Sequence, residues 1–185
     1  MNIPPQAKKV FTGKIFDVYQ WEQKLFDGSS ETFEMLKRPN TLQVIATIGD
    51  TIVIAMDEQP GRPPRPTLLG GRQEPDETPL EGAKRELLEE SGLASSDWEE
   101  FTCIQPVGKI EWNVYTFIAR DCKKIQNPQL DPGEKIDLQY LSFDECIATI
   151  LSESFWGREM ETLVLTMKLN GTLEEFRKRI FKRTE

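Results

Sequence analysis

One stretch near the middle of the chain, residues 71–93 (GRQEPDETPLEGAKRELLEESGL), constrains the fold more than any other. Its TPLE segment, which begins at Thr78, is a capping box with proline at the first helical position, a pattern that begins helices. Gly92 is typical of a helix end, because glycine readily adopts the left-handed conformation found there. We therefore predict a helix over residues 79–91.

The predicted helix has one acidic face and one apolar face. At about 3.6 residues per turn, Glu86, Glu89 and Glu90 share one stripe. The neighbouring stripe can bury against a sheet and consists of Leu80, Ala83 and Leu87. Carboxylates three and four residues apart repel each other unless a cation lies among them, and Mg²⁺ or Mn²⁺ suits such oxygen ligands. The alternative is an acidic face exposed to solvent.

Nine positions of this stretch match the Nudix box, Gly-x5-Glu-x7-Arg-Glu-U-x-Glu-Glu-x-Gly-U with U an aliphatic residue, so the chain resembles a Nudix hydrolase. The matching residues are Gly71, Glu77, Arg85, Glu86, Leu87, Glu89, Glu90, Gly92 and Leu93. The resemblance implies an α/β fold, a Nudix-type α/β/α sandwich with an N-terminal antiparallel β appendage. It also implies metal-dependent hydrolysis of a nucleoside diphosphate linked to another moiety.

The same resemblance implies roles for individual box residues. Arg85 is expected to pair with Glu77 and to hold the loop against the helix. The implied metal ligands are the carboxylates of Glu86, Glu89 and Glu90 and the backbone carbonyl of Gly70, with Glu89 also counted as catalytic and Glu74 placed in the outer shell. Mg²⁺ or Mn²⁺ is the expected cofactor.

Composition removes several function classes. The net charge of −8 argues against general affinity for nucleic acid or anionic membranes, because both would repel the chain. Histidine is absent, which excludes Ser-His-Asp and Cys-His catalysis and histidine-ligated metals. Cys103, Cys122 and Cys146 form no CxxC pattern, so we expect reduced thiols in the cytoplasm. The sequence shows neither an apolar signal segment nor a run that could span a membrane.

Residues 1–40 are predicted to form an antiparallel β appendage, and residues 41–185 the hydrolase domain with helices at its end. The appendage carries more aromatic residues than a lone hairpin can bury, so it needs the main domain or a second subunit as partner. These residues are Phe11, Phe16, Tyr19, Trp21 and Phe33. Its layout resembles the ADP-ribose pyrophosphatase branch of the family, which implies a homodimer whose appendage reaches the partner's active site.

Resemblance to that branch implies ADP-ribose or a related nucleotide sugar as substrate, cleaved to AMP and a sugar phosphate. Phe33 and Trp21 are candidates for stacking on the base, although aromatic strand residues are more often core. Arg38, in the LKRP segment, matches the substrate-side arginine of the family. Arg62 or Arg65 would replace the arginine that many relatives carry two residues after a Glu-Gln pair, and the alternative for both is a solvated loop.

Strand and turn signals predict the elements around the box. Apolar runs at residues 42–48 and 51–56 predict a core hairpin, and the proline-rich residues 57–66 predict a loop. After the box we expect strands over residues 98–107 and 110–120. The remaining predicted elements are a loop over residues 122–132, a strand over residues 136–141 and three helices that begin after Ser142, at Arg158 and after Thr172, the first and third with side-chain caps.

Because histidine is absent, the base that takes a proton from water is expected to be a carboxylate outside the box. By resemblance, the GEKI segment matches the loop that carries this glutamate in the ADP-ribose branch, so Glu134 is the first candidate. Glu111 is the reserve. The alternative for Glu134 is a solvated loop carboxylate.

Two rival functions fit the same fold. A non-catalytic nucleotide-sugar sensor would be expected to lack box carboxylates or to carry a DNA-binding appendage, and neither feature is present. Isoprenoid diphosphate isomerisation would be expected to need a metal-binding histidine, which the chain lacks. We therefore favour a metal-dependent hydrolase with a small-molecule nucleotide diphosphate as substrate.

Overall fold

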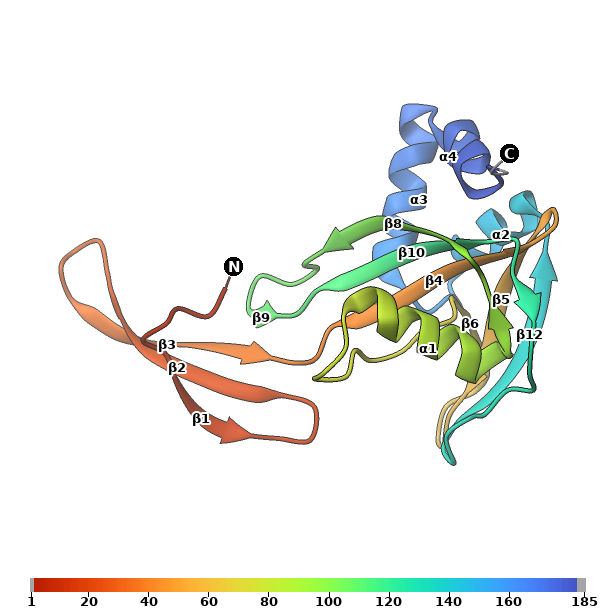
Figure 1. Ribbon diagram of the computed structural model, residues 1–185. Helices are drawn as coiled ribbons and strands as arrows, with labels where there is room; N and C mark the ends of the chain where they lie inside the picture. Colours follow the sequence, from red (N-terminus) through yellow and green to blue (C-terminus); the bar gives the residue numbers. More distant parts are fainter. Residues whose placement is uncertain (1, 183–185) are drawn as a thin grey trace.

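The computed structural model describes residues 2–182, and its centre is a six-stranded mixed sheet (Figure 1). The strands of this sheet are β4 (Thr41–Ile48), β5 (Thr51–Glu58), β6 (Arg65–Thr67), β8 (Asp97–Ile104), β10 (Val114–Arg120) and β12 (Lys135–Leu141). They lie in the order β12, β5, β4, β10 and β8, and β6 pairs with β5 off this path. A separate two-stranded sheet joins β7 (Leu93–Ala94) to β11 (Lys123–Lys124).

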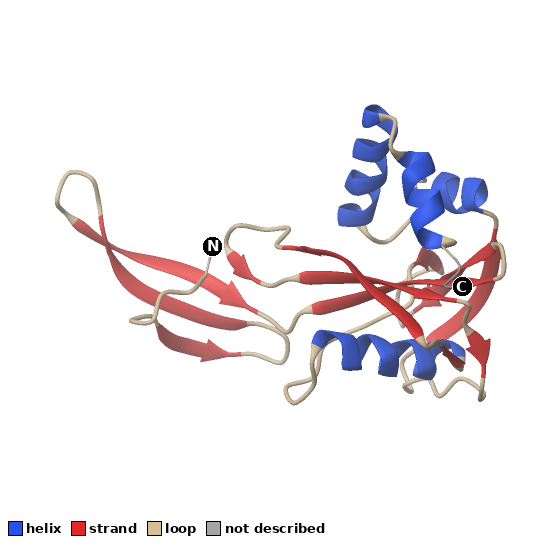
Figure 2. Ribbon diagram, turned by 45° about the horizontal axis from the view of Figure 1, so that its top comes forward, coloured by secondary structure: helices blue, strands red, loops and turns tan. Residues whose placement is uncertain are grey.

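Helices cover both faces of the central sheet, which gives the predicted α/β/α sandwich (Figure 2). α1 (Pro79–Ser91) packs on one face, and α2 (Phe143–Ile150), α3 (Arg158–Asn170) and α4 (Leu173–Ile180) pack on the other. Strand alternation divides the core: Val53 and Ala55 of β5 face α1, whereas Ile52 and Ile54 face the C-terminal helices. Within residues 2–182, none of these helices is long and apolar enough to cross a membrane.

The N-terminal strands form a second, four-stranded sheet that extends away from the sandwich (Figure 1). It consists of β1 (Lys8–Thr12), β2 (Asp17–Lys24), β3 (Ser30–Lys37) and β9 (Ile110–Glu111), in that order. Its fourth strand therefore comes from far along the chain, beyond the predicted boundary at residue 40. The division of function between appendage and main domain stays a prediction.

The single strand predicted over residues 110–120 is wrong, because the structure divides it into β9 and β10. β9 pairs with β3 in parallel, and β10 pairs with β4 in parallel. The segment from β3 to β4 and the segment from β9 to β10 therefore pass side by side from the N-terminal sheet to the central sheet. Pro39 lies at this break, and its missing N–H cannot continue the ladder. Asn40 Oδ1 instead accepts a hydrogen bond from the Asn113 N–H at 2.9 Å, which ties the two crossings together.

Two local predictions are corrected by the structure. Thr172 makes no side-chain cap on α4; its hydroxyl donates weakly to the Met167 carbonyl of the preceding helix, at 3.5 Å. The glycine turn between the helices is so short that Thr172 closes α3 instead of opening α4. The proline-rich loop also ends earlier than expected, since β6 adds an edge strand that starts at Arg65. Proline is tolerated there because an edge strand has unpaired positions.

Candidate active site

Two glycines before α1 bring the chain close to a neighbouring strand and to the helix itself. Gly70 has a φ of +136°, and a Cβ on it would lie 2.0 Å from the Leu42 carbonyl oxygen. A Cβ on Gly71 would lie 2.5 Å from Oε1 of Glu86. Glycine is therefore required at position 70, where a side chain would collide with backbone, whereas a side chain at position 71 would displace the Glu86 carboxylate.

Arg85 joins three glutamates at the front of α1. Its Nε and Nη2 donate to the two carboxylate oxygens of Glu77 at 3.0 and 2.8 Å, and these hydrogen bonds hold the pKa of Glu77 below its usual range. Its Nη1 donates to Glu86 at 2.9 Å and to Glu89 at 3.0 Å. Glu77 and Arg85 thus fix the loop that precedes the helix, in a two-point contact that only arginine can make.

Glu90 is the most buried of the box carboxylates, with an exposed fraction of 9%. Its Oε2 accepts a hydrogen bond from the Gly70 N–H at 2.7 Å, and within residues 2–182 no cationic side chain pairs with it. Burial raises the pKa of Glu90 well above its usual 4.5, and the charges of Glu86 and Glu134 add to this effect. A carboxylate in this environment is costly to ionise unless a cation joins it.

The donor set suits a divalent cation, but the carboxylates do not close around one position as they stand. No three acidic side chains of the described chain are arranged to hold a metal ion. Arg85 accounts for this, because one of its nitrogens holds both Glu86 and Glu89, while Glu90 turns to Gly70. Glu86 and Glu90 fit a metal by their burial and oxygen chemistry, and the complete ligand set stays a prediction.

Glu134 lies in the turn before β12, within electrostatic reach of the box. Its Oε2 accepts a hydrogen bond from the Asp131 N–H at 3.3 Å. Partial burial raises the pKa of Glu134, and its charge in turn raises the pKa values of Glu86 and Glu90. The turn therefore brings the predicted base to the acidic face of α1.

Asp57, a carboxylate that the sequence analysis did not single out, lies close to the same group. It follows Val53 and Ala55 on the side of β5 that faces α1. Burial raises the pKa of Asp57, whose negative charge raises the pKa values of Glu90 and Glu134. Its Oδ1 is buried and has no hydrogen-bond partner within the described residues. The signal that could have revealed it is a charged residue where the strand alternation requires an apolar one.

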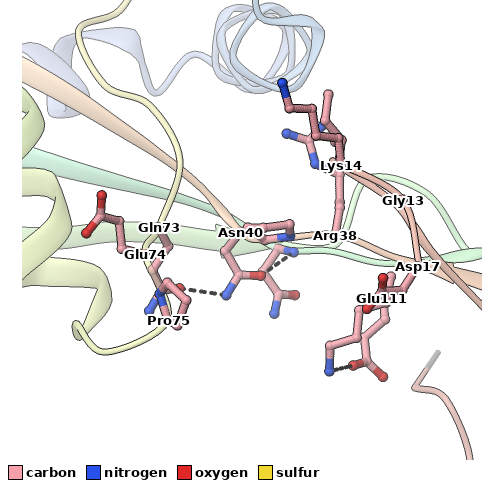
Figure 3. A pocket seen from close by; sticks show the side chains of 13 residues that line it. Gly13, Lys14, Asp17, Arg38, Asn40, Gln73, Glu74, Pro75 and Glu111 are labelled. Atoms are coloured by element: carbon pink, nitrogen blue, oxygen red, sulfur yellow. Dashed lines mark hydrogen bonds and ion pairs between the residues drawn. The ribbon is translucent and has the colours of Figure 1, made fainter. Parts of the chain in front are cut away.

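A cleft of about 520 Å³ separates the appendage from the box loop (Figure 3). Arg38 lines it, with its guanidinium 4.7 Å from the ring centroid of Trp112 and 5.7 Å from that of Phe16. The Nε of Arg38 is buried and has no acceptor among residues 2–182. Figure 3 shows Lys14 and Arg38 on one side of the cleft and Gln73, Glu74 and Pro75 on the other. The cleft therefore offers cationic groups beside the box loop without including the acidic face itself.

Among the other predicted substrate and base residues, the two aromatic candidates lie outside this cleft and Glu111 lies in it. Trp21 is buried, its Nε1 donates to Gln23 at 3.0 Å, and its ring packs beside Phe33, so neither aromatic residue lines the cleft. Glu111 does line the cleft, but it pairs with Lys37 at 2.6 Å. This ion pair holds the pKa of Glu111 low against the opposing effect of burial. Glu111 thus lies beside the box loop, whereas Glu134 acts on the carboxylates of α1.

A second, open cleft of about 540 Å³ lies between the proline-rich loop and the turn before β12. Its lining includes Arg62 on one side and Glu134 and Lys135 on the other. Arg62 is therefore placed on the Glu134 side of the molecule, away from the cleft that contains Arg38.

Comparison with known proteins agrees with this geometry. The NUDIX domain description matches residues 37–161. An ADP-ribose pyrophosphatase of Bacillus subtilis (strain 168) is 23% identical over 172 residues, which cover 90% of this chain and 92% of that protein. A methanol dehydrogenase activator of Bacillus methanolicus is 24% identical over 175 residues, covering 91% and 94% of the two chains.

A solved structure described as an ADP compounds hydrolase shares the fold, with a TM-score of 0.71 and 16% identity, and the match covers 90% of this chain and 93% of the other. The family match spans most of the chain, from the end of the appendage to the start of α3. The glycine turn, the Glu77–Arg85 pair and the acidic face of α1 lie within it. The chain belongs to the NUDIX family.

Proposed function

We propose that this protein is a metal-dependent hydrolase of nucleoside diphosphates linked to another moiety, with ADP-ribose or a related nucleotide sugar cleaved to AMP and a sugar phosphate. The observation that carries the proposal is Glu90, a buried carboxylate with no cationic partner in the described chain, beside Glu86 and Glu134. Such a group is stabilised by a bound cation and is otherwise costly. The names of two similar proteins, an ADP-ribose pyrophosphatase and an ADP compounds hydrolase, support the substrate class.

Glu86 and Glu90, with Glu89 and the Gly70 carbonyl, would hold Mg²⁺ or Mn²⁺. When bound, the metal supplies positive charge to the diphosphate oxygens and to an attacking water. Gly71 leaves room for this approach, because it places no side chain against the Glu86 carboxylate. Arg85 holds the loop against the helix through Glu77, and its Nη1 donates to Glu86 and Glu89, which would exchange this contact for the cation.

Glu134 is proposed as the general base that takes a proton from the attacking water. A base works best when its pKa lies near the operating pH, and burial together with neighbouring charges raises the pKa of Glu134 toward that range. Arg38, held against Trp112 beside the box loop, is proposed to contact the substrate, as is Arg62 on the Glu134 side. The free thiols of Cys103, Cys122 and Cys146 support a cytoplasmic location.

The test is hydrolysis of ADP-ribose in Mg²⁺ by the wild type and by Glu86→Gln and Glu90→Gln. Each change keeps side-chain volume but removes a ligand charge, so we expect kcat/KM to fall by roughly 10²-fold or more with an unchanged circular dichroism spectrum. Glu153→Gln, an exposed change outside the site, serves as the control and should retain full activity. Near-normal turnover in either box variant would show that the metal ligands are misassigned.

The rival function, a sensor that binds nucleotide sugars without cleaving them, gives a different result. It predicts saturable binding of ADP-ribose with no AMP released in Mg²⁺ or Mn²⁺. Mixing enzyme and ligand at equal concentration and following AMP by chromatography separates the two functions, since even slow single turnover would be visible.

A further inference from the structure

Trp156 lies in the loop between α2 and α3, with a fixed backbone and an exposed ring. Its N–H donates to the Pro66 carbonyl at 2.8 Å, and its own carbonyl accepts from the Thr67 hydroxyl at 3.0 Å. Both contacts fasten the loop to strand β6. The indole nevertheless has an exposed fraction of 52%. The ring is therefore a fixed aromatic surface on which other groups can stack.

Two arginines lie against this ring. The guanidinium carbon of Arg62 is 5.0 Å from the Trp156 ring centroid, and that of Arg65 is 5.5 Å from it. Burial raises the pKa of Asp57 and the charge of Arg62 acts against this rise, but within residues 2–182 neither guanidinium forms an ion pair with a carboxylate. Stacking on an aromatic ring orients a guanidinium while leaving its N–H groups free to bind an anion.

Arg65 forms no ion pair within residues 2–182 even though a carboxylate lies on the neighbouring strand. Arg65 is the direct cross-strand neighbour of Asp57, a placement that allows an arginine–carboxylate pair. Arg65 turns to Trp156 instead, and Asp57 Oδ1 keeps no hydrogen-bond partner in the described chain. The guanidinium is therefore available to a ligand.

Arg65 lies two strands across the sheet from β12, the strand that follows the proposed base. Asp57 pairs with Arg65 on one side and with Ile136 on the other, so these three residues lie side by side across the sheet. Two strand spacings amount to about 10 Å. Glu134 lies two residues before Ile136, and Arg62 lines the same open cleft as Glu134.

We propose that Trp156, Arg62 and Arg65 form an anion-binding subsite for the part of the substrate that leaves with the distal phosphate. This inference rests on the proposed function and narrows its substrate class. The favoured substrates are diphosphate compounds whose non-nucleoside half carries a further phosphate monoester or carboxylate. Trp156 orients the two arginines, and their free N–H groups bind the acidic group in the two-point geometry that arginine allows.

The experiment compares ADP-ribose with ADP-ribose that carries a phosphate monoester on its terminal ribose. These compounds differ only in the group that the subsite would bind. We expect the wild type to prefer the phosphorylated compound by about tenfold or more in kcat/KM. Arg65→Gln and Trp156→Leu should reduce that preference to within about twofold.

Two further variants test the geometry of the contact. Arg65→Lys keeps the charge but loses the planar, stacked guanidinium, so it should retain only part of the preference. Arg177→Gln is the matched control. Arg177 is an exposed residue of α4, and its guanidinium carbon lies 5.5 Å from the ring centroid of Phe143 on α2, away from the subsite. This variant should leave the preference unchanged. No preference in the wild type, or a full preference in Arg65→Gln, would overturn the proposal.

Calorimetric titration separates this proposal from the proposed function. With Ca²⁺ in place of Mg²⁺, the ratio of dissociation constants for the two compounds reports the subsite whether or not turnover occurs. A tenfold ratio that disappears in Arg65→Gln would support the subsite even if neither compound is cleaved. Equal affinities together with rapid cleavage would refute the subsite and leave the hydrolase intact. A loss of affinity for both compounds in Trp156→Leu would show that the ring stacks on a base, which also contradicts the proposal.

Discussion

At the scale of single residues, the Glu90 carboxylate is buried without a cationic partner in the described chain. It is 9% exposed and accepts one hydrogen bond, from the Gly70 N–H. In the presence of a chelator, Glu90→Gln should therefore be more stable than the wild type, because the amide needs no compensating cation. We expect its thermal midpoint to rise by about 2 °C or more at neutral pH, which differential scanning calorimetry would measure.

The pH dependence of this difference has a definite sign. The pKa of Glu90 in the folded protein is raised above 4.5, so its contribution to stability is full below that value and is lost as the pH rises through the folded pKa. Glutamine does not titrate. The stability gap between variant and wild type should thus be absent near pH 4 and open above about pH 4.5. A gap that is constant from pH 4 to neutral pH would mean that burial of the charge is not its cause.

Glu134 and Glu111 also differ in pKa, which is raised in Glu134 and lowered in Glu111. One variant of each residue tests which of them is the general base. Glu134→Gln should lower kcat by roughly 10²-fold or more with little change in KM or metal affinity, as loss of a general base requires. Glu111→Gln should have a small effect on kcat, since Glu111 already pairs with Lys37. If Glu111→Gln were crippled and Glu134→Gln silent, the base would lie on the strand beside the appendage.

At the scale of secondary structure, two threonines provide a matched comparison. Thr78 caps α1. Its hydroxyl accepts a hydrogen bond from the Glu81 N–H at 3.3 Å, and the Glu81 carboxylate accepts one from the Thr78 N–H at 2.8 Å. Thr172 makes no side-chain cap on α4. Thr78→Ala should cost about 1 kcal/mol in urea unfolding, and Thr172→Ala much less. Equal losses at the two positions would mean that the Thr78 cap does not stabilise α1.

The box helix was predictable to the residue, because its start and end are specified by neighbours in sequence. Thr78, Pro79 and Gly92 act over a few positions, and the structure places α1 over Pro79–Ser91 as expected. Its acidic and apolar stripes follow from the helical period alone. Local signals of this kind predict helix ends correctly where no contact with a distant part of the chain overrides them.

The break between β9 and β10 could not be predicted in the same way. Residues 110–120 have an uninterrupted β-rich pattern, and nothing local marks Trp112 and Asn113 as a crossing point. The break arises from partners some seventy residues away: Pro39 interrupts β3 and β4, and Asn40 bonds to the Asn113 N–H. Trp156 was missed for a similar reason, since its neighbour Pro66 joins it only in the folded chain, whereas Asp57 carried a local signal, a charge at an inward-facing strand position.

At the scale of the whole molecule, the exposed face of the appendage predicts a homodimer. Trp21 and Met35 are buried within the chain, but several apolar side chains of the first 26 residues face solvent. These are Val10, Phe11, Ile15 and Phe26. We expect sedimentation to report twice 21.3 kDa, because an apolar surface of this kind is stabilised by a partner copy.

Charged substitutions test which surface forms the dimer. Phe11→Asp should convert the protein to a monomer, whereas Leu169→Asp, at a more exposed apolar position on α3, should not. A wild type that sediments as a monomer with full activity would remove the case for an active site shared between subunits. Dissociation by Leu169→Asp alone would move the interface to the C-terminal helices.

The parallel pairing of β9 with β3 also sets an order of events during synthesis. β1, β2 and β3 are complete once Lys37 has been made, but the fourth strand of their sheet ends at Glu111, 74 residues later. At the usual pace of translation, about 5 to 20 residues per second, this interval is roughly 4 to 15 s. The β3 edge stays open for that time on every nascent chain. Lys109, Ile110 and Glu111 therefore act as the last piece of an N-terminal sheet that cannot be completed until more than half of the protein has left the ribosome.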